Sequence, residues 1–474
     1  MEGKTVHYSP GDLVQPLGSV ETLMAVGGIY GTLNTIQAIW IKSKFPLEEE
    51  KILQSLWMLS RQIPHLQFCL SRRGWRLWFK RMETFNLDFE MKAGDAMEVY
   101  EDMIDSKYNL WTGPLWKVKV IVPNTNNNVN DEQYSAAVIF SLHHCMTDGT
   151  ANMKICREFV KILNEINQGK INEPEINPLA PVVDKNMPEF PSITFLTKYF
   201  CTKFFATMIK NFYHKSSFAG VLPVPKTKIT KTKVLYDELS KTETDILIKM
   251  CKLNDITVHS CISTIANFAL LQVAQSKASY PLGVRKINVT HCVNMRRYLS
   301  PEYSDASGCH ISFMEDRRKT SLKDSLDFWK EAKKTHSSLK AHLEVAKDQL
   351  RIVPLLRMAS MIFPANVFLT RNGYKNKTDC HYITTNMGNL KTLLPGPEAN
   401  DTVEITSVLR SVSAHLGGNP FLIAFHTFRG KFMLSLDYYT NKMTDETAHE
   451  YFTVFKTFIR NVIEYDNLHG TTRF

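Results

Sequence analysis

Hydrophobic and polar positions follow strand-like and then helix-like spacing twice within the first 170 residues. Residues 31–44 (GTLNTIQAIWIKSK) alternate and are rich in β-branched side chains, and residues 46–64 then space apolar side chains about 3.6 apart. The same order recurs at 133–144 (QYSAAVIFSLHH), a largely buried strand, and at 151–167, an amphipathic helix. The pattern therefore predicts that the segment HHCMTDG forms a turn between a strand and a helix.

The second half of the chain continues the mixed pattern. Helical spacing predicts helices at 240–255, with Ser240 as the N-cap, and at 257–275, and a strand follows at 286–295. The pattern also predicts a charged helix, four short strands and a last amphipathic helix, respectively at 321–349, 381–390, 411–418, 419–430, 431–440 and 445–465. We expect an α/β or α+β protein with two related halves.

A proline-rich segment separates the two halves. Residues 168–191 contain five prolines and show little periodicity, which is typical of a linker or a long crossover. A length of 474 residues also favours two domains, which we place at 1–190 and 191–474. Residues 195–218 interleave aromatic side chains with lysines, and this pattern fits either a helix packed on the protein or an interfacial helix on a membrane.

Composition and charge exclude several classes of protein. The net charge of +10 is dispersed along the chain, which favours solvated surfaces over a nucleic-acid interface. Nine cysteines without a CxxC pair indicate neither a disulfide framework nor a zinc cluster. The polar N-terminus and the absence of a long uncharged apolar stretch predict a cytoplasmic protein, with membrane association as an open alternative.

The pair His143–His144, at the end of a buried strand, is the sharpest chemical signal in the sequence. An imidazole has the unperturbed pKa that suits a general base near neutral pH. Neighbouring residues of a strand point to opposite sides, so only one of the two rings can face a cleft. A core histidine, a metal site with Asp148 and a covalent Cys145 nucleophile are the alternative interpretations.

The segment SLHHCMTDG resembles the HHxxxDG motif of the chloramphenicol-acetyltransferase-like superfamily. That superfamily includes alcohol O-acetyltransferases, wax-ester synthases and peptide-synthetase condensation domains. Four further segments resemble its motifs in order and spacing: RQIPHL at 61–66, GPLWKVKVI at 113–121, VNMRRYL at 293–299 and TTNMGNL at 384–390. The alcohol O-acetyltransferase branch is the most similar, and the DFGWG motif of the plant acyltransferase branch is absent from the sequence.

The resemblance implies a fold and a set of residue roles. It implies two chloramphenicol-acetyltransferase-like subdomains, each a mixed sheet flanked by helices, with a tunnel between them. The second motif histidine, here His144, is the base in this superfamily, and the motif aspartate, Asp148, pairs with the arginine that matches Arg296. Gly149 permits a close backbone approach. Thr385 and Asn386 are candidates for oxyanion or substrate contacts, with a turn-forming role as the alternative.

These observations together predict a CoA-dependent O-acyltransferase. The expected substrates are an acyl-CoA, used as a co-substrate, and a small hydrophobic alcohol. We expect a monomer that needs no metal or redox cofactor. Two rival hypotheses remain open: transfer to an amine, as in condensation domains, and a catalytically silent homologue that binds a lipid.

Overall fold

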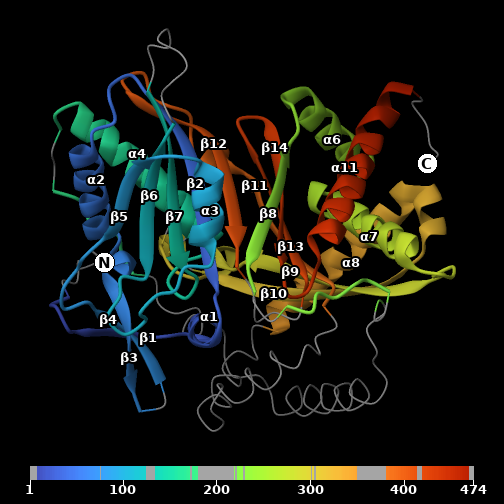
Figure 1. The fold of residues 1–474 in the computed structure, drawn as a ribbon, viewed down its shortest axis with the longest axis horizontal. Helices are drawn as coiled ribbons and strands as arrows, with labels where there is room; N and C mark the ends of the chain where they lie inside the picture. The colour runs from blue at the N-terminus through green and yellow to red at the C-terminus, as the bar shows by residue number, and fades with distance from the viewer. Residues whose placement is uncertain are drawn as a thin grey trace.

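The chain folds into two lobes that lie side by side, each built on its own β-sheet (Figure 1). The computed structural model describes residues 8–123, 134–179, 218–349, 380–413 and 419–468, apart from short gaps within these ranges. Almost all of the predicted segment 195–218 lies outside the described residues, and so does the predicted domain boundary at 190. The division into 1–190 and 191–474 therefore stays a prediction.

The first lobe contains a five-stranded mixed sheet with the order β12-β2-β7-β6-β5. Its central strands β2 (Asn34–Ser43) and β7 (Tyr134–His143) are antiparallel, with Asn34 opposite His143. Only the pair β5–β6 is parallel. The remaining strands of this sheet are β5 (Asp88–Ala93), β6 (Trp116–Val122) and β12 (Val403–Val412).

Helices cover both faces of this sheet, which explains why β2 is apolar on both sides. Helices α2 (Glu49–Gln62) and α4 (Gly149–Asn167) pack together on one face, where Ile39 and Ile41 join their hydrophobic core. Helix α3 (Ala96–Ile104) packs on the other face against Ile36 and Ala38. A small antiparallel sheet and two helical segments complete the lobe: β1 (Leu13–Pro16), β3 (Phe68–Arg73), β4 (Arg76–Arg81), α1 (Ser19–Tyr30) and η1 (Pro64–Gln67).

The second lobe contains a six-stranded mixed sheet with the order β10-β9-β11-β13-β14-β8. Strand β11 is parallel to both of its neighbours, and the other pairs are antiparallel. The strands are β8 (Thr232–Glu238), β9 (Arg285–Asn294), β10 (Ile311–Thr320), β11 (Tyr382–Asn389), β13 (Phe421–Phe428) and β14 (Lys431–Tyr439).

A nearly fully buried helix, α7 (Val258–Lys277), forms the centre of the helical layer of this lobe. Helices α6, α8 and α11 pack around it (Figure 1). Their bounds are α6 (Lys241–Leu253), α8 (Phe328–Gln349) and α11 (Asp445–Leu468), and the short 3-10 segments are η3 (Arg296–Tyr298), η4 (Pro301–Tyr303), η5 (Leu322–Asp327) and η7 (Leu390–Thr392). Among the described helices none alone is long and apolar enough to span a membrane, and the one pair that qualifies together, α6 with α7, is bent by 98°.

Strand β12 ties the two lobes together. It comes from the second half of the chain but pairs antiparallel with β2 of the first lobe, from Val403 opposite Ser43 to Val412 opposite Thr35. A single cut in the sequence therefore does not separate the two sheets. The sequence pattern assigned only the end of this strand, as part of the segment 411–418.

The predicted fold class is confirmed, because both lobes are mixed sheets flanked by helices. The predicted N-cap of α6 is also confirmed: the Ser240 hydroxyl accepts a hydrogen bond from the Glu243 amide at 3.2 Å. The charged helix predicted at 321–349 is divided into the 3-10 turn η5 and the helix α8. The predicted tunnel between the lobes stays a prediction.

Candidate active site

The HHCMTDG segment forms the predicted turn between a strand and a helix. Strand β7 ends at His143 and helix α4 begins at Gly149. Asp148 is the N-cap of α4, and its Oδ1 accepts a hydrogen bond from the Ala151 amide at 3.0 Å. A buried N-cap carboxylate satisfies one of the free amides at the start of the helix and so fixes where the helix begins.

The two motif histidines have different surroundings. His143 packs edge-on against the Tyr108 ring and lies under Gly28 of α1, so closely that a Cβ at Gly28 would be 1.9 Å from its Nε2. Burial lowers the pKa of His143 to about 3. His143 is therefore a neutral packing residue, which agrees with the prediction that only one of the two rings faces the site.

Hydrogen bonding fixes the tautomer of the His144 ring. Its Nδ1 lies 2.8 Å from the backbone carbonyl of Thr147. A carbonyl oxygen can only accept, so Nδ1 carries the proton and Nε2 keeps its lone pair. Among the described residues Nε2 has no hydrogen-bond partner, which leaves this lone pair available to a substrate hydroxyl.

The electrostatic surroundings keep the His144 ring neutral. Its side chain is 7% exposed, and burial lowers its pKa below the ordinary value, an effect that the bond to the Thr147 carbonyl and the charge of Asp148 partly offset. The thiol of Cys309 lies 3.8 Å from Nδ1. A neutral ring with a free Nε2 has the protonation state that a general base requires.

Asp148 and Arg296 form the buried ion pair that the resemblance implies. The Arg296 Nη1 lies 2.6 Å from Asp148 Oδ2, and both side chains are almost fully buried. Burial alone would raise the pKa of Asp148, but the charge and hydrogen bond of Arg296 outweigh it and hold this pKa below its usual value. The pair links the first lobe, which carries Asp148, to η3 of the second lobe.

The segment just before β10 supports this ion pair. The His310 amide donates to Asp148 Oδ2 at 2.7 Å. Arg296 Nη2 donates to the Gly308 carbonyl at 3.0 Å, and its Nε donates to the Ala306 carbonyl at 3.3 Å. These bonds bring Cys309 next to His144, so the second lobe forms one wall of the site.

Gly149 permits a close approach by the second lobe. A Cβ at Gly149 would lie 2.8 Å from the Sδ of Met387, which belongs to the predicted TTNMGNL turn. The two candidates before it have structural partners: Arg410 of β12 donates to the Thr385 carbonyl at 2.7 Å, and Asn386 Oδ1 accepts from the Gly388 amide at 2.7 Å. The bond from Gly388 supports the turn-forming role of Asn386, and the oxyanion role of both residues stays a prediction.

The structure weakens two of the alternative interpretations. Burial raises the pKa of Cys145 well above its usual value, so its thiol stays protonated inside the hydrophobic core, whereas a nucleophile must be a thiolate. The metal site with His144 and Asp148 is not supported, because the Asp148 carboxylate already bonds Arg296, His310 and Ala151, and the described residues contain no group of three or more side chains that could hold a metal ion.

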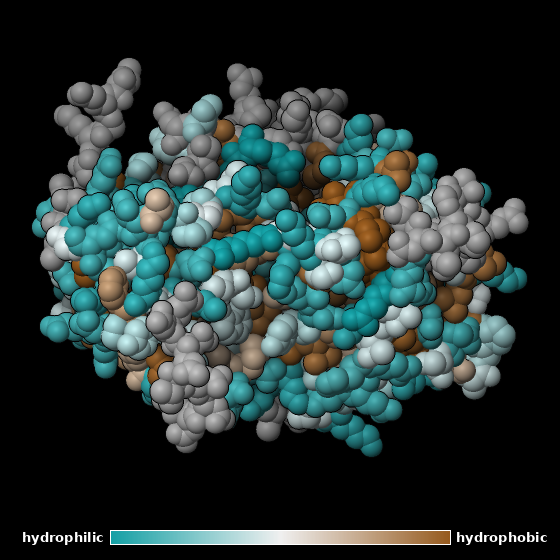
Figure 2. All heavy atoms as spheres, turned by 90° about the horizontal axis from the view of Figure 1, so that it is seen from above, coloured by the Kyte–Doolittle hydropathy of each residue, from teal (hydrophilic) through white to brown (hydrophobic). Residues whose placement is uncertain are grey.

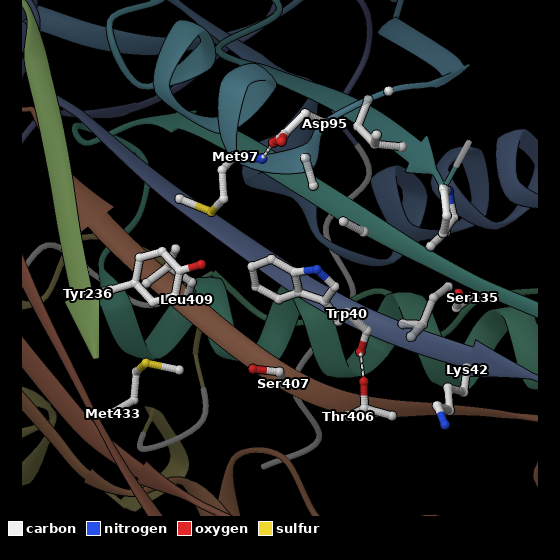
Figure 3. Close-up of a pocket in the computed structure, with 17 residues that line it drawn as sticks. Trp40, Lys42, Asp95, Met97, Ser135, Tyr236, Thr406, Ser407, Leu409 and Met433 are labelled. Atoms are coloured by element: carbon white, nitrogen blue, oxygen red, sulfur yellow. Dashed lines mark hydrogen bonds between the residues drawn. The ribbon is translucent and has the colours of Figure 1, made fainter. Parts of the chain in front are cut away.

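A cavity of about 640 Å³ lies at the other end of β7 (Figure 3). Trp40 of β2 and Leu409 of β12 form its floor, and Met97, Tyr236 and Met433 surround them. Ser135 also lines it, eight strand residues from His143, which corresponds to about 26 Å. This cavity is not part of the His144 site.

Figure 2 shows the molecule from above, relative to the view of Figure 1. This face is mostly hydrophilic, and apolar side chains are visible between the polar ones near its centre.

Sequence reasoning did not find several residues that shape the site. Cys309 and His310 reach the site through the pairing of β9 with β10, and Arg410 reaches it on strand β12. Asn152 lies one helical turn after Asp148 and accepts a hydrogen bond from the Thr147 hydroxyl at 2.5 Å. Only Asn152 carried a usable signal, because its spacing from Asp148 places it on the same side of the helix.

Solved structures confirm the two-lobed fold. A trichothecene 15-O-acetyltransferase from Fusarium sporotrichioides superposes with a TM-score of 0.73 at 13% identity, over 94% of this chain and 95% of that one. The epimerization domain of the third module of tyrocidine synthetase B superposes with a TM-score of 0.60 at 13% identity, over 97% and 99%. Polyketide synthase associated protein 5 from Mycobacterium tuberculosis gives 0.58 at 13%, over 96% and 100%. At these identities the similarity shows the fold alone.

The comparison with protein families identifies the family of the chain, which fold similarity at 13% identity cannot do. No curated protein matches the sequence. The alcohol acetyltransferase family model matches residues 81–405, more than half of the chain, and this range includes the HHCMTDG turn, Arg296 and the TTNMGNL turn. The chain is therefore an acyltransferase that belongs to the alcohol acetyltransferase family.

Proposed function

We propose that the protein transfers an acyl group from an acyl-CoA thioester to the hydroxyl of a small hydrophobic alcohol, with His144 as the general base. The observation that carries this proposal is the 2.8 Å bond from His144 Nδ1 to the Thr147 carbonyl, which leaves the Nε2 lone pair free. Membership of the alcohol acetyltransferase family supports an alcohol as the acceptor.

The proposed reaction takes place in one ternary complex. His144 Nε2 removes the hydroxyl proton while the alcohol oxygen attacks the thioester carbonyl. The tetrahedral intermediate then collapses, the C–S bond breaks, and the CoA thiolate leaves and takes the proton from the imidazolium. The products are an ester and free CoA. The proposed reaction steps require no metal ion or redox cofactor.

Two features of the site suit this chemistry. The ring of His144 is buried, which favours its neutral form and excludes water that would hydrolyse the thioester. The Asp148–Arg296 pair holds the turn without using the imidazole, so the carboxylate stabilises the structure and does not act as an acid or base. Thr385 and Asn386 remain our candidates for donors to the oxyanion.

The direct test measures free CoA thiol after the purified protein is mixed with acetyl-CoA, or with a longer acyl-CoA, and each member of a panel of alcohols. We expect thiol release that depends on the alcohol, together with an ester of the expected mass. Primary amines with the same carbon skeletons are the matched control and should react much more slowly. Release that does not depend on the acceptor, or amide formation faster than ester formation, would contradict the proposal.

A further inference from the structure

Three buried polar residues that are not named positions of the HHxxxDG motif form a hydrogen-bonded chain that ends at Thr147, the residue whose backbone carbonyl bonds His144. The Thr147 hydroxyl donates to Asn152 Oδ1 at 2.5 Å, and Asn152 Nδ2 donates to Thr35 Oγ1 at 2.8 Å. Thr147 occupies a variable position of the motif, Asn152 lies on α4, and Thr35 lies on β2. The chain thus joins three different elements of the first lobe.

The amide of Asn152 is committed at both ends. Its oxygen accepts from Thr147 and its nitrogen donates to Thr35, and all three side chains are at most 2% exposed. A buried polar group that loses its partner is not compensated by water, so this arrangement resists rotation of the amide and of both hydroxyls. The position of Thr147 is therefore fixed from the body of the first lobe.

Thr147 is also the residue whose carbonyl fixes the His144 tautomer. The ion pair of Asp148 with Arg296 holds the next residue from the second lobe. The peptide group between Thr147 and Asp148 is consequently anchored on both sides. A shift or rotation of this peptide would turn its carbonyl away from Nδ1.

We propose that Asn152 is a positioning residue for the base, and that it acts through Thr147 by holding the carbonyl that keeps the proton on His144 Nδ1. The inference rests on the proposed function of His144. Without the chain from Thr35 through Asn152, the neutral ring populates both tautomers and tilts, so a fraction of the molecules presents Nε2 as a donor and not as a base.

Four variants test the chain. Thr147→Val removes the hydroxyl at nearly constant volume and keeps the backbone carbonyl, and Thr147→Ser restores the hydroxyl. Asn152→Ala removes the central link. Asn164→Ala is the matched control, because Asn164 is a buried amide on the same helix that bonds Thr402 and Val403, about 18 Å along the helix from Asn152.

The first measurement is the ¹⁵N chemical shift pattern of the His144 ring in protein labelled at histidine, assigned with His144→Gln. We expect one Nδ1–H tautomer in the natural protein and in Asn164→Ala. Thr147→Val and Asn152→Ala should show a mixture of both tautomers, and Thr147→Ser should largely restore the single form. This readout does not depend on turnover.

The second measurement is the steady-state rate. We expect Thr147→Val and Asn152→Ala to lower kcat about 10- to 100-fold, with the KM for acyl-CoA changed little, because the ring is misplaced and not the substrate. Asn164→Ala should lower the melting temperature but not kcat. Thr147→Val is the least disruptive of these variants. We expect it to fold even if Asn152→Ala does not.

Different results would overturn the proposed role of His144 and the proposed role of Asn152. Full activity of His144→Ala overturns the proposed function, whatever the tautomer. A single Nδ1–H tautomer and an unchanged kcat in folded Thr147→Val overturn the inference about Asn152 and leave the role of His144 standing. An equal loss of kcat in Asn164→Ala also overturns the inference, because the effect is then one of general stability.

Discussion

At the scale of single residues, adjacent side chains of one turn have separate tasks. His143 packs beneath α1, and His144 keeps a free Nε2. Asp148 caps helix α4 and forms an ion pair with Arg296. These tasks follow from alternation along the end of β7 and from the tight turn into α4. A substitution at each residue should therefore affect a different observable.

The buried position of His144 predicts the pH dependence of the reaction. Burial lowers its pKa below 6.5, and a general base works only when it is deprotonated. As the pH falls, activity should therefore persist below pH 6.5 and decline only where the ring becomes protonated. The measurement is kcat/KM against pH, and an acid limb with an apparent pKa clearly above 6.5 would contradict this account.

Removing the charge of Asp148 should destabilise the protein more than it affects the chemical step. Asp148→Asn keeps a side chain that can cap α4 but leaves the Arg296 guanidinium buried without its partner, which typically costs about 3–5 kcal/mol. Denaturant unfolding of both proteins measures the loss. Glu404→Gln, which breaks a half-exposed pair with Arg429, is the control and should cost less than about 1 kcal/mol. Equal losses would refute this assignment.

At the scale of elements, α1 is fitted closely to the strand that carries the motif. Gly28→Ala should test this fit, because alanine favours a helix over glycine by about 0.5–1 kcal/mol, whereas its Cβ would meet His143 Nε2 at 1.9 Å. We expect the cost of this clash to exceed the gain in helix propensity and to lower the free energy of unfolding by about 1–3 kcal/mol. Gly396→Ala, which meets nothing within 4 Å, is the control. A stabilised Gly28→Ala would show that α1 does not press on His143.

The elements also show which parts of the structure the sequence could predict. The strand–turn–helix unit around HHCMTDG followed from local periodicity, and the pairing of Asp148 with Arg296 followed from the resemblance. The place of strand β12 in the first sheet could not be predicted, because its partner β2 lies more than 350 residues earlier in the chain and no local pattern specifies which sheet a strand joins. Cys309 was missed for the same reason, since it reaches His144 only through long-range contacts.

At the scale of the whole molecule, buried neutral histidines should make the fold sensitive to acid. Burial lowers the pKa of several histidines from 6.5 to about 3 or 4, namely His65, His143, His259, His310 and His426. Above pH 6.5 neither state binds these protons. Below it the unfolded chain binds protons that the folded protein excludes, so stability falls as the pH decreases toward 4.

The melting temperature between pH 7 and pH 4 measures this effect. We expect a progressive decrease that begins near pH 6.5, and a shallower decrease in His65→Gln, which removes one of the buried sites. A melting temperature that stays constant down to pH 4 would show that these histidines do not couple proton binding to unfolding.

The two lobes meet at the proposed site. The first lobe supplies His144, and the second supplies Arg296, Cys309 and Met387 around it. The crossover strand β12 joins the two sheets beside this point, where Arg410 bonds Thr385. We therefore propose that His144, at the interface of the lobes, is the centre of the chemistry.

The most direct test of that claim compares CoA release by the natural protein and by His144→Ala, with the same acyl-CoA and the best alcohol. We expect kcat to fall about 10²- to 10⁴-fold, the range that a general base typically contributes, while the melting temperature changes little. A folded His144→Ala protein that releases CoA at the natural rate would contradict the account.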